Sequence, residues 1–181
     1  MMEKRMVLFV AVIMGMSLFS GCATNIHPPN EANVPPTEKL GNFTNITLES
    51  SVVEPKYGDN VSNRKAVNKI DEVMNQRLKT VFPQLNSQKN NAGKALVIKP
   101  QILAIKFISG GKRAWAGAIA GDSAVLLQVD FFDQQKKTII ASPKFYAKAN
   151  AITSDYSMGG SDNAMLQRIV SAVVEYSTKH K

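Results

Sequence analysis

The feature that most limits what this chain can fold into is an uncharged apolar run near its N-terminus, which ends just before the only cysteine. Residues 6–19 follow the basic pair Lys4-Arg5 and contain no charged side chain. The run is roughly 14 residues long, whereas a helix needs about 18 to 20 apolar residues to cross a membrane. A basic segment followed by a short apolar one is typical of a secretion signal. We therefore expect residues 1–21 to be removed and to take no part in the fold.

The junction Leu18-Phe19-Ser20-Gly21-Cys22 resembles the lipobox of bacterial lipoproteins, in which small residues precede a cysteine that is lipidated and becomes the mature N-terminus. Phe19 departs from the motif, which usually has Leu, Val or Ile at that position. A single cysteine cannot form an internal disulfide, so its thiol is free for another use. The resemblance implies that Cys22 carries a lipid anchor. The alternative is an ordinary signal peptide that is cleaved after a later small residue.

The residue after the cysteine is Ala23. In the sorting rule of Gram-negative lipoproteins, Asp at this position retains the protein on the inner membrane, and other residues let it pass outward. The resemblance therefore implies the periplasmic face of the outer membrane, or the outer face of the plasma membrane in a Gram-positive host. Residues 22–39 contain two Pro-Pro pairs and little apolar material, which predicts an extended spacer. Residues 40–181 are then expected to form a single domain.

Two apolar stripes at helical spacing predict the two helices of this domain. The first helix should cover roughly Asn63–Phe82 and stop at Pro83. Ser161 or Asp162 can cap the second helix, since their side-chain oxygens accept its free amide protons. The apolar positions are Val67, Ile70, Met74, Leu78 and Val81 in the first helix, and Met165, Ile169, Ala172, Val173 and Tyr176 in the second.

Four segments predict strands: Leu40–Val53, Ala95–Ile108, Ser123–Phe132 and Lys137–Asn150. Pro100 cannot donate to a ladder, so it indicates an edge position or a bulge in the second strand. A short turn makes the last two strands an antiparallel hairpin. The order strand, helix, three strands, helix predicts an α+β domain in which an antiparallel sheet of about four strands has both helices on one face.

The most unusual part of the mature sequence is a run of Gly and Ala between two predicted strands, residues 110–121. It is not a phosphate-binding loop, because Arg follows its lysine where that motif needs Ser or Thr. Two of its glycines have the small-xxx-small spacing of closely packed helices, and its tryptophan is the only one in the chain. The alternative is that the small residues only let a bent connection pack on its own sheet. The candidate partner-binding residues are Lys112, Arg113, Trp115, Gly117 and Gly121.

The stretch Arg113-Ala-Trp-Ala-Gly-Ala-Ile-Ala-Gly121, and the strand that ends Val129-Asp130-Phe-Phe-Asp133, resemble a family of bacterial lipoproteins called domain of unknown function 4410. The similarity covers about Leu40 to Tyr176, although Gln134-Gln135 stand where the family often has Thr-Gly. The resemblance implies an α+β envelope domain. It supplies no catalytic residues.

The residue types argue against catalysis and against a metal site. Zinc needs clusters of His, Cys and carboxylates, and a serine triad needs a histidine. The only histidines are His27, within the predicted spacer, and His180, next to the C-terminus. Asp130 and Asp133 flank a turn, where carboxylates are more often solvated than catalytic. We expect no enzyme activity, no metal and no cofactor.

Without residues 1–21 the chain has 20 basic and 13 acidic residues, a net charge of +7. Such a protein is attracted to anionic envelope components, while the scattered charges and the exported location argue against nucleic acid. We expect a membrane-anchored, non-enzymatic binding or assembly module for another envelope component, most simply a protein, that binds through a sheet edge or the Gly-Ala segment. The alternatives are a carrier that holds a lipid or cell-wall fragment on the sheet face between the helices, and an oligomer built by edge pairing.

The lipid assignment predicts that Cys22→Ser abolishes partitioning of the protein into membranes, because no other residue in the chain can take the anchor. The measurement is the distribution of wild type and variant between membrane and soluble fractions. A variant that is still lipid-anchored would contradict the assignment.

Overall fold

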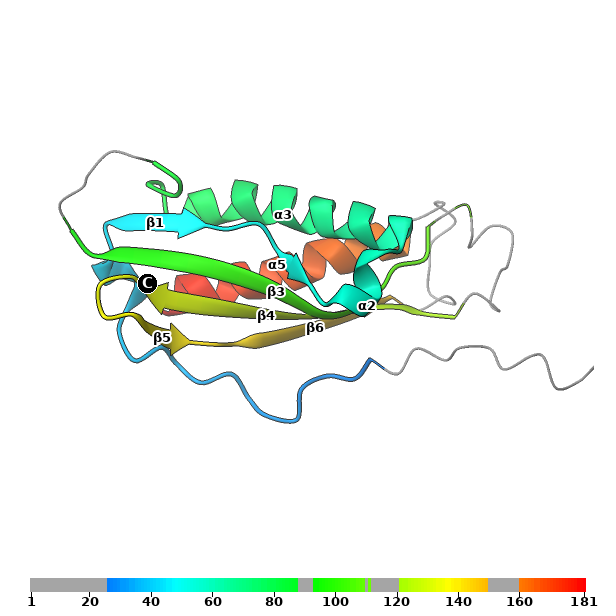
Figure 1. Cartoon of the computed structure of the whole chain (residues 1–181), viewed down its shortest axis with the longest axis horizontal. Helices are drawn as coiled ribbons and strands as arrows, with labels where there is room; N and C mark the ends of the chain where they lie inside the picture. The colour runs from blue at the N-terminus through cyan, green and yellow to red at the C-terminus, as the bar shows by residue number, and fades with distance from the viewer. Residues whose placement is uncertain (1–25, 88–92, 110, 112–120, 150–159) are drawn as a thin grey trace, which may run out of the picture.

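The computed structural model describes residues 26–87, 93–109, 111, 121–149 and 160–181. A 3-10 turn at Leu40–Asn42 precedes the first strand. In chain order the elements are then β1 (Asn45–Leu48), β2 (Val52–Val53), α2 (Pro55–Gly58), α3 (Val61–Val81), β3 (Ala95–Lys106), β4 (Ser123–Asp133), β5 (Thr138–Ala141), β6 (Lys144–Ala149) and α5 (Gly160–Lys179). Figure 1 shows the strands lying together in one sheet, with α3 along its top and α5 passing behind it.

The antiparallel pair β3–β4 is the centre of the sheet. β1 and β2 both pair with β3, while β5 and β6 both pair with β4. The predicted α+β class, with two main helices packed on one sheet face, is confirmed. One detail differs, because β1 and β2 run parallel to β3. The long helix between β2 and β3 carries the chain back across the sheet, and such a crossover brings the next strand in parallel.

Pro100 lies in a central strand, so of the two predicted alternatives, an edge position or a bulge, the edge position is wrong. It stands opposite Val129, whose N–H donates to Pro143 O, away from β3. The nitrogen of Pro100 therefore faces the side on which β1 and β2 pair. It cannot donate there, and the neighbouring strand is interrupted at this level, between Leu48 and Val52. The bulge of β3 lies slightly further on, between Ile102 and Ala104.

A second interruption divides the predicted last strand into β5 and β6, at Ser142-Pro143. The turn that precedes β5 contains Lys137 with a φ of +56°. Opposite sides of the β3–β4 pair therefore each carry two short strands where the sequence pattern predicts one. The two breaks face each other across Pro100 and Val129.

The two long helices cover one face of the sheet, as their apolar stripes predict. Their buried side chains pack on the inward residues of β3, β4 and β6 in a single core. Between the helices, the Arg77 guanidinium donates to Ser171 Oγ at 2.6 Å and to Gln167 Oε1 at 2.7 Å. Tyr176 of α5 contacts Phe131 of β4, with ring centroids 5.8 Å apart. The space between helices and sheet is thus filled by protein side chains.

The helix ends are set by local polar groups. α3 begins at Val61 because the Asn60 side chain accepts from the N–H groups of Ser62 and Asn63. α5 begins at Gly160, so Asp162 lies in its first turn and not at its cap. Neither helix, nor any other in the described ranges, has the length and hydropathy needed to cross a bilayer.

An isoleucine-to-alanine substitution should lower the free energy of unfolding by different amounts at a buried and at an exposed position of the sheet. Ile98 is fully buried and Ile139 is 54% exposed. Ile98→Ala should lower the free energy of unfolding by about 2–5 kcal/mol, because it leaves a cavity under the helices. Ile139→Ala should cost about 0.5 kcal/mol or less. Chemical denaturation of both variants measures the difference. Equal costs would contradict the assignment of the inner face.

Candidate binding face

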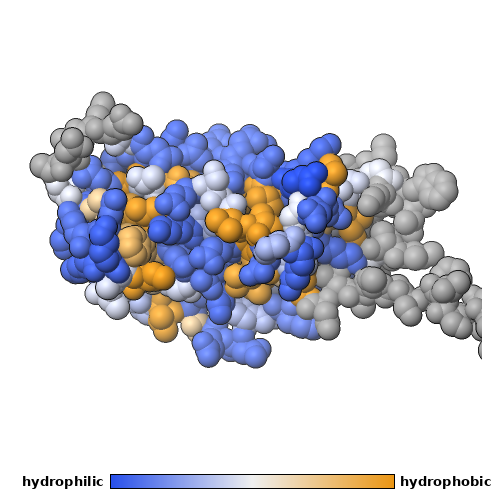
Figure 2. Space-filling model, viewed as in Figure 1, coloured by the Kyte–Doolittle hydropathy of each residue, from blue (hydrophilic) through white to orange (hydrophobic). Residues whose placement is uncertain are grey.

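The sheet face turned away from α3 and α5 is named here the outer face. It is formed by alternate residues of β3, β4 and β6, since their neighbours along each strand belong to the core. Figure 2, which looks onto this side, shows apolar patches set among hydrophilic ones over the strands. The outer-face residues are Lys99, Gln101, Leu103, Ala104 and Lys106 of β3, Ala124, Leu126, Gln128, Asp130 and Phe132 of β4, and Lys144, Tyr146 and Lys148 of β6.

A polar cluster lies in the middle of the outer face. Asp130 is only 6% exposed, although it points away from the core. Its carboxylate accepts hydrogen bonds from Gln101 Nε2 at 3.0 Å, from Gln128 Nε2 at 2.9 Å and from the Ser142 hydroxyl. Lys99 stands opposite Asp130 in the ladder, but its ammonium lies 4.4 Å from the centre of the Phe132 ring. The Asp130 carboxylate therefore links β3, β4 and the segment between β5 and β6, and all of its donors are uncharged side chains.

One sheet edge, β1, is covered by the loop that follows α3. Asn86 donates its N–H to Ile46 O at 2.8 Å, and its side-chain oxygen accepts from the N–H of Leu48 at 2.9 Å. Asn86 adopts a φ of +59°, a conformation that asparagine tolerates better than most residues. Asn86 thus forms hydrogen bonds with one backbone carbonyl and one backbone N–H group of the β1 edge. This blocks the pairing groups that another strand would need.

The opposite edge, β5–β6, is covered by residues 26–39, named here the strap. The Asn33 side chain donates to Lys144 O at 2.9 Å and accepts from Lys144 N–H at 2.8 Å. Thr37 N–H donates to Ile140 O at 2.9 Å, and Tyr176 Oη donates to Val34 O at 2.8 Å. Figure 1 shows the strap running along this edge. From Asn33 onward, the segment predicted as a spacer is therefore bound to the domain.

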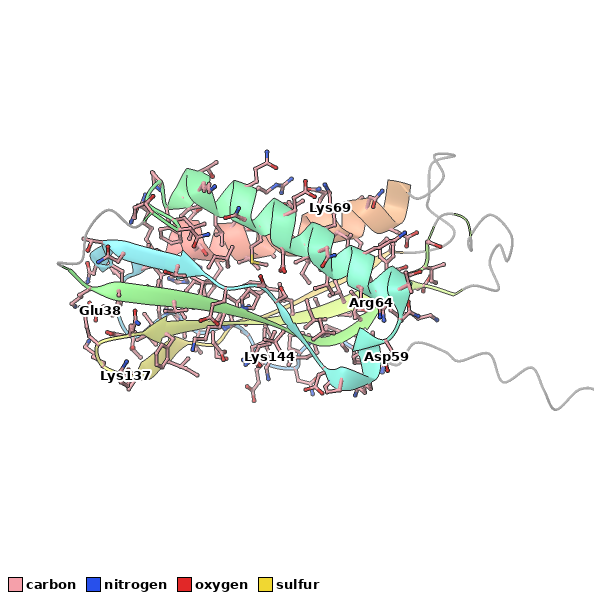
Figure 3. All side chains as sticks on the ribbon, turned by 45° about the horizontal axis from the view of Figure 1, so that its top comes forward. Glu38, Asp59, Arg64, Lys69, Lys137 and Lys144 are labelled. Atoms are coloured by element: carbon pink, nitrogen blue, oxygen red, sulfur yellow. The ribbon has the colours of Figure 1, made fainter. Side chains whose placement is uncertain are left out.

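Glu38 holds the end of the strap. Its side chain is 13% exposed and pairs with Lys136, at 2.7 Å, and with Lys94. The hydrogen bonds from Lys136 and then from Lys94 lower the pKa of Glu38 from 4.5 to about 2, and the pairing with Glu38 raises the pKa of Lys136. Lys94 lies directly before β3, and Lys136 lies in the β4–β5 turn. One carboxylate therefore links three distant parts of the chain at one end of the sheet, where Figure 3 labels Glu38.

A hollow of about 500 Å³ lies between the strap and the outer face. Leu103 and Leu126 form its floor on β3 and β4. The bulge of β3 adds Leu103 beside Ala104, which stands opposite Leu126. This extra residue places a second leucine on the outer face. The remaining lining comes from strap residues 27–34 and from Ser142, Pro143 and Lys144.

Most of the residues proposed from the sequence lie outside the described ranges: Cys22, Ala23, Lys112, Arg113, Trp115 and Gly117. Gly121 is described, directly before β4, with a φ of +73° that favours glycine. A Cβ at this position would lie 3.2 Å from Lys106 Nζ. The glycine is therefore explained by the turn into β4 and by the close approach of Lys106.

The aspartates and histidines considered as catalytic residues make contacts that belong to the fold or to the hollow. Asp130 and Asp133 lie on opposite faces of β4. Asp133 is buried, and its Oδ1 accepts from the N–H groups of Gln135 and Lys136 in the turn. His27 lines the hollow, and the His180 ring lies 4.5 Å from that of Tyr176. The described part of the chain contains no group of three His, Cys, Asp or Glu residues able to hold a metal ion.

No family model and no curated protein matches the chain. Among solved structures, PelC from Paraburkholderia phytofirmans, crystallised as a dodecamer, aligns with 81% of this chain and 94% of its own, at 8% identity and a TM-score of 0.53. XCC0632 from Xanthomonas campestris, assigned to family DUF330, aligns with 84% of this chain and 93% of its own, at 7% identity and a TM-score of 0.50. A minor lipoprotein from Acinetobacter baumannii aligns at 14% identity, over 76% of this chain and 91% of its own, with a TM-score of 0.36. The first two comparisons show that the chain shares its fold with PelC and XCC0632.

The Glu38 pairs predict an acid-sensitive link between strap and domain. Because folding lowers the pKa of Glu38 from 4.5 to about 2, its stabilising effect is fully present above pH 4.5 and is lost as the pH falls towards 2. Glu38→Gln should therefore reduce the loss of stability over this pH range. The measurement is the free energy of unfolding of wild type and variant between these pH values.

Glu72→Gln controls for the loss of one negative charge, since Glu72 forms an exposed pair with Lys69 on α3. An identical acid profile for wild type and Glu38→Gln would contradict the role assigned to Glu38.

Proposed function

We propose that the chain is a lipid-anchored envelope protein whose domain is a non-enzymatic binding or assembly module for another envelope component, and that it binds through its outer face. The distribution of covered surfaces carries this proposal. Helices cover the inner face, Asn86 covers the β1 edge and the strap covers the β5–β6 edge. Within the described ranges, the part of the outer face beyond the hollow is one surface of the sheet that these elements leave open, and it is the one that we assign to a partner.

In this proposal Cys22 holds the lipid and Ala23 directs the protein to the periplasmic face of the outer membrane. The lipobox-like junction, with Ala after its cysteine, supports this location. The Gly-Ala segment from Lys112 to Gly121 is the second part of the proposed binding surface. It connects the two central strands whose alternate residues form the outer face.

Binding to a second copy is one form of the same proposal. The support is that PelC, which shares this fold, is described as a dodecamer. Because Asn86 and the strap bond to parts of the two sheet edges, we expect an assembly of this chain to use the outer face or the Gly-Ala segment before edge pairing. Light scattering of the purified mature protein distinguishes a self-assembling module from a monomer that binds another protein.

The hollow favours a second candidate, a carrier of a small molecule such as a lipid or a cell-wall fragment. Its volume of about 500 Å³ lies within the usual range for ligand sites. It lies on the outer face, whereas the sheet face between the helices is filled by the core. Native mass spectrometry of gently extracted protein separates the candidates, because a bound small molecule favours the carrier and a bound polypeptide favours the module.

The binding proposal predicts which side of the domain a partner contacts in intact cells. Lys144 and Lys69 are both exposed lysines, and Figure 3 shows them on opposite sides, on β6 and on α3. A photo-crosslinking amino acid at position 144 should give a discrete crosslinked protein band, and one at position 69 should not. Trp115→Ala should weaken the band at position 144 without changing the circular dichroism spectrum. Equal crosslinking from both positions, or a band only from position 69, would sink the proposal.

A further inference from the structure

The floor of the hollow is apolar and lies outside the core of the domain. Leu103 and Leu126 face the strap across a space that no side chain of the core fills. Three proline rings, an alanine and a valine add to the lining. The apolar lining residues are Pro28, Pro29, Ala32, Val34, Leu103, Leu126 and Pro143.

The charged residues of the lining lie at exposed positions. Glu31 belongs to the strap and Lys144 to the start of β6, and both side chains are exposed. The Asn33 amide is already bonded to the Lys144 backbone, so it fixes the wall of the hollow. An occupant therefore meets an apolar floor and a polar, solvent-facing rim. This distribution suits a hydrocarbon chain that enters from a polar attachment point.

In the sequence, Cys22 lies a few residues before the strap. His27 lines the hollow, and Cys22 precedes it by five residues. An extended chain advances about 3.4 Å per residue, so these five residues reach about 17 Å. A group on the Cys22 sulfur or amine is thus tethered within reach of the hollow at a high effective concentration.

We propose that the hollow holds one of the acyl chains attached to Cys22. The proposal rests on the lipid anchoring proposed above, and it names the ligand of the hollow: a single hydrocarbon chain, supplied by the protein's own anchor. Leu103 and Leu126 contact its methylenes, and the prolines of the strap form the opposite wall. The exposed groups of Glu31 and Lys144 stay in water at the rim.

In this proposal the acyl chain of the anchor has two alternative locations, the bilayer and the hollow. When the protein is on a membrane, the bilayer takes the acyl chains. When the protein is in water, the hollow covers one chain and reduces the apolar surface that would drive aggregation. The strap then has a direct role, because its hydrogen bonds to Lys144, Ile140 and Tyr176 hold the wall against which the chain packs.

The single cysteine makes a direct test feasible. The mature chain, residues 22–181, is produced without its signal and alkylated at Cys22 with a maleimide that carries a nitroxide-labelled stearyl chain. Leucine methyl NMR then measures paramagnetic broadening. The proposal predicts intramolecular broadening at Leu103 and Leu126, independent of protein concentration. Broadening spread over other leucines such as Leu85 and Leu166, or found only in large aggregates, would overturn it.

Two matched variants and one free probe complete the test. Leu126→Glu places a carboxylate on the floor and should abolish the broadening at Leu103, whereas Ile139→Glu, on the same sheet but outside the hollow, should not. Broadening that survives Leu126→Glu contradicts the proposal. Nitroxide-labelled stearic acid added to the Cys22→Ser chain should bind far more weakly than the tethered chain. Equal binding would make the hollow a general amphiphile site and overturn the assignment to the anchor.

This experiment does not depend on lipidation in cells. Failure of the Cys22→Ser partitioning test would remove the proposed anchoring and leave the affinity of the hollow for a hydrocarbon chain measurable. Failure of the broadening test would remove the proposed ligand and leave the anchoring and the outer-face binding module untouched.

Discussion

The antiparallel pairing of β3 with β4 is the constraint on which the rest of the structure depends. Every other strand is attached to one of these two, and both long helices pack on the side chains that the pair turns inward. The pairing also decides what lies on the outer face. A shift of β4 by one residue would exchange Leu126 and Gln128 with Leu127 and Val129, and would bury the Gln128 amide in the core. Burial of Ile98, Ile102 and Val125 under the helices therefore fixes the polar cluster around Asp130.

The strands on both sides of the β3–β4 pair are interrupted, and a proline lies at each interruption. Pro100 removes a donor on the β1–β2 side, and the carbonyl of Pro143 accepts from Val129 on the other. Each flank is thereby divided into short strands, which offer little continuous edge. Asn86 on one side and Asn33 on the other then bond to the edge backbone through their side chains. Short, covered edges are a common protection against pairing with other chains. This is why we propose the outer face as the surface that binds a partner.

Much of the fold is predictable from the sequence because it depends on local periodicity. The stripes of α3 and α5 predict the buried faces, and Val67, Ile70, Met74, Ile169 and Tyr176 are indeed buried. The parallel direction of β1 was missed, although a strand followed by a long helix and another strand is the pattern of a parallel crossover. The strap could not be predicted as bound, because its composition is that of a spacer. Its contacts join residues far apart in the chain, such as Asn33 with Lys144 and Glu38 with Lys136. The hollow was missed for the same reason, since its floor depends on a bulge that adds Leu103.

The central proposal is that a partner binds the outer face, since the helices cover the inner face and Asn86 and the strap bond to parts of the two edges. Hydroxyl-radical footprinting tests it most directly, by comparing side-chain oxidation in native envelopes with oxidation of the purified protein. We expect oxidation of the outer-face residues Phe132 and Tyr146, which lie outside the hollow, to fall in the envelope, while that of the exposed Val61 at the start of α3 stays the same. Protection of Val61 and the rest of α3, with unchanged oxidation of the outer-face residues, would contradict the account.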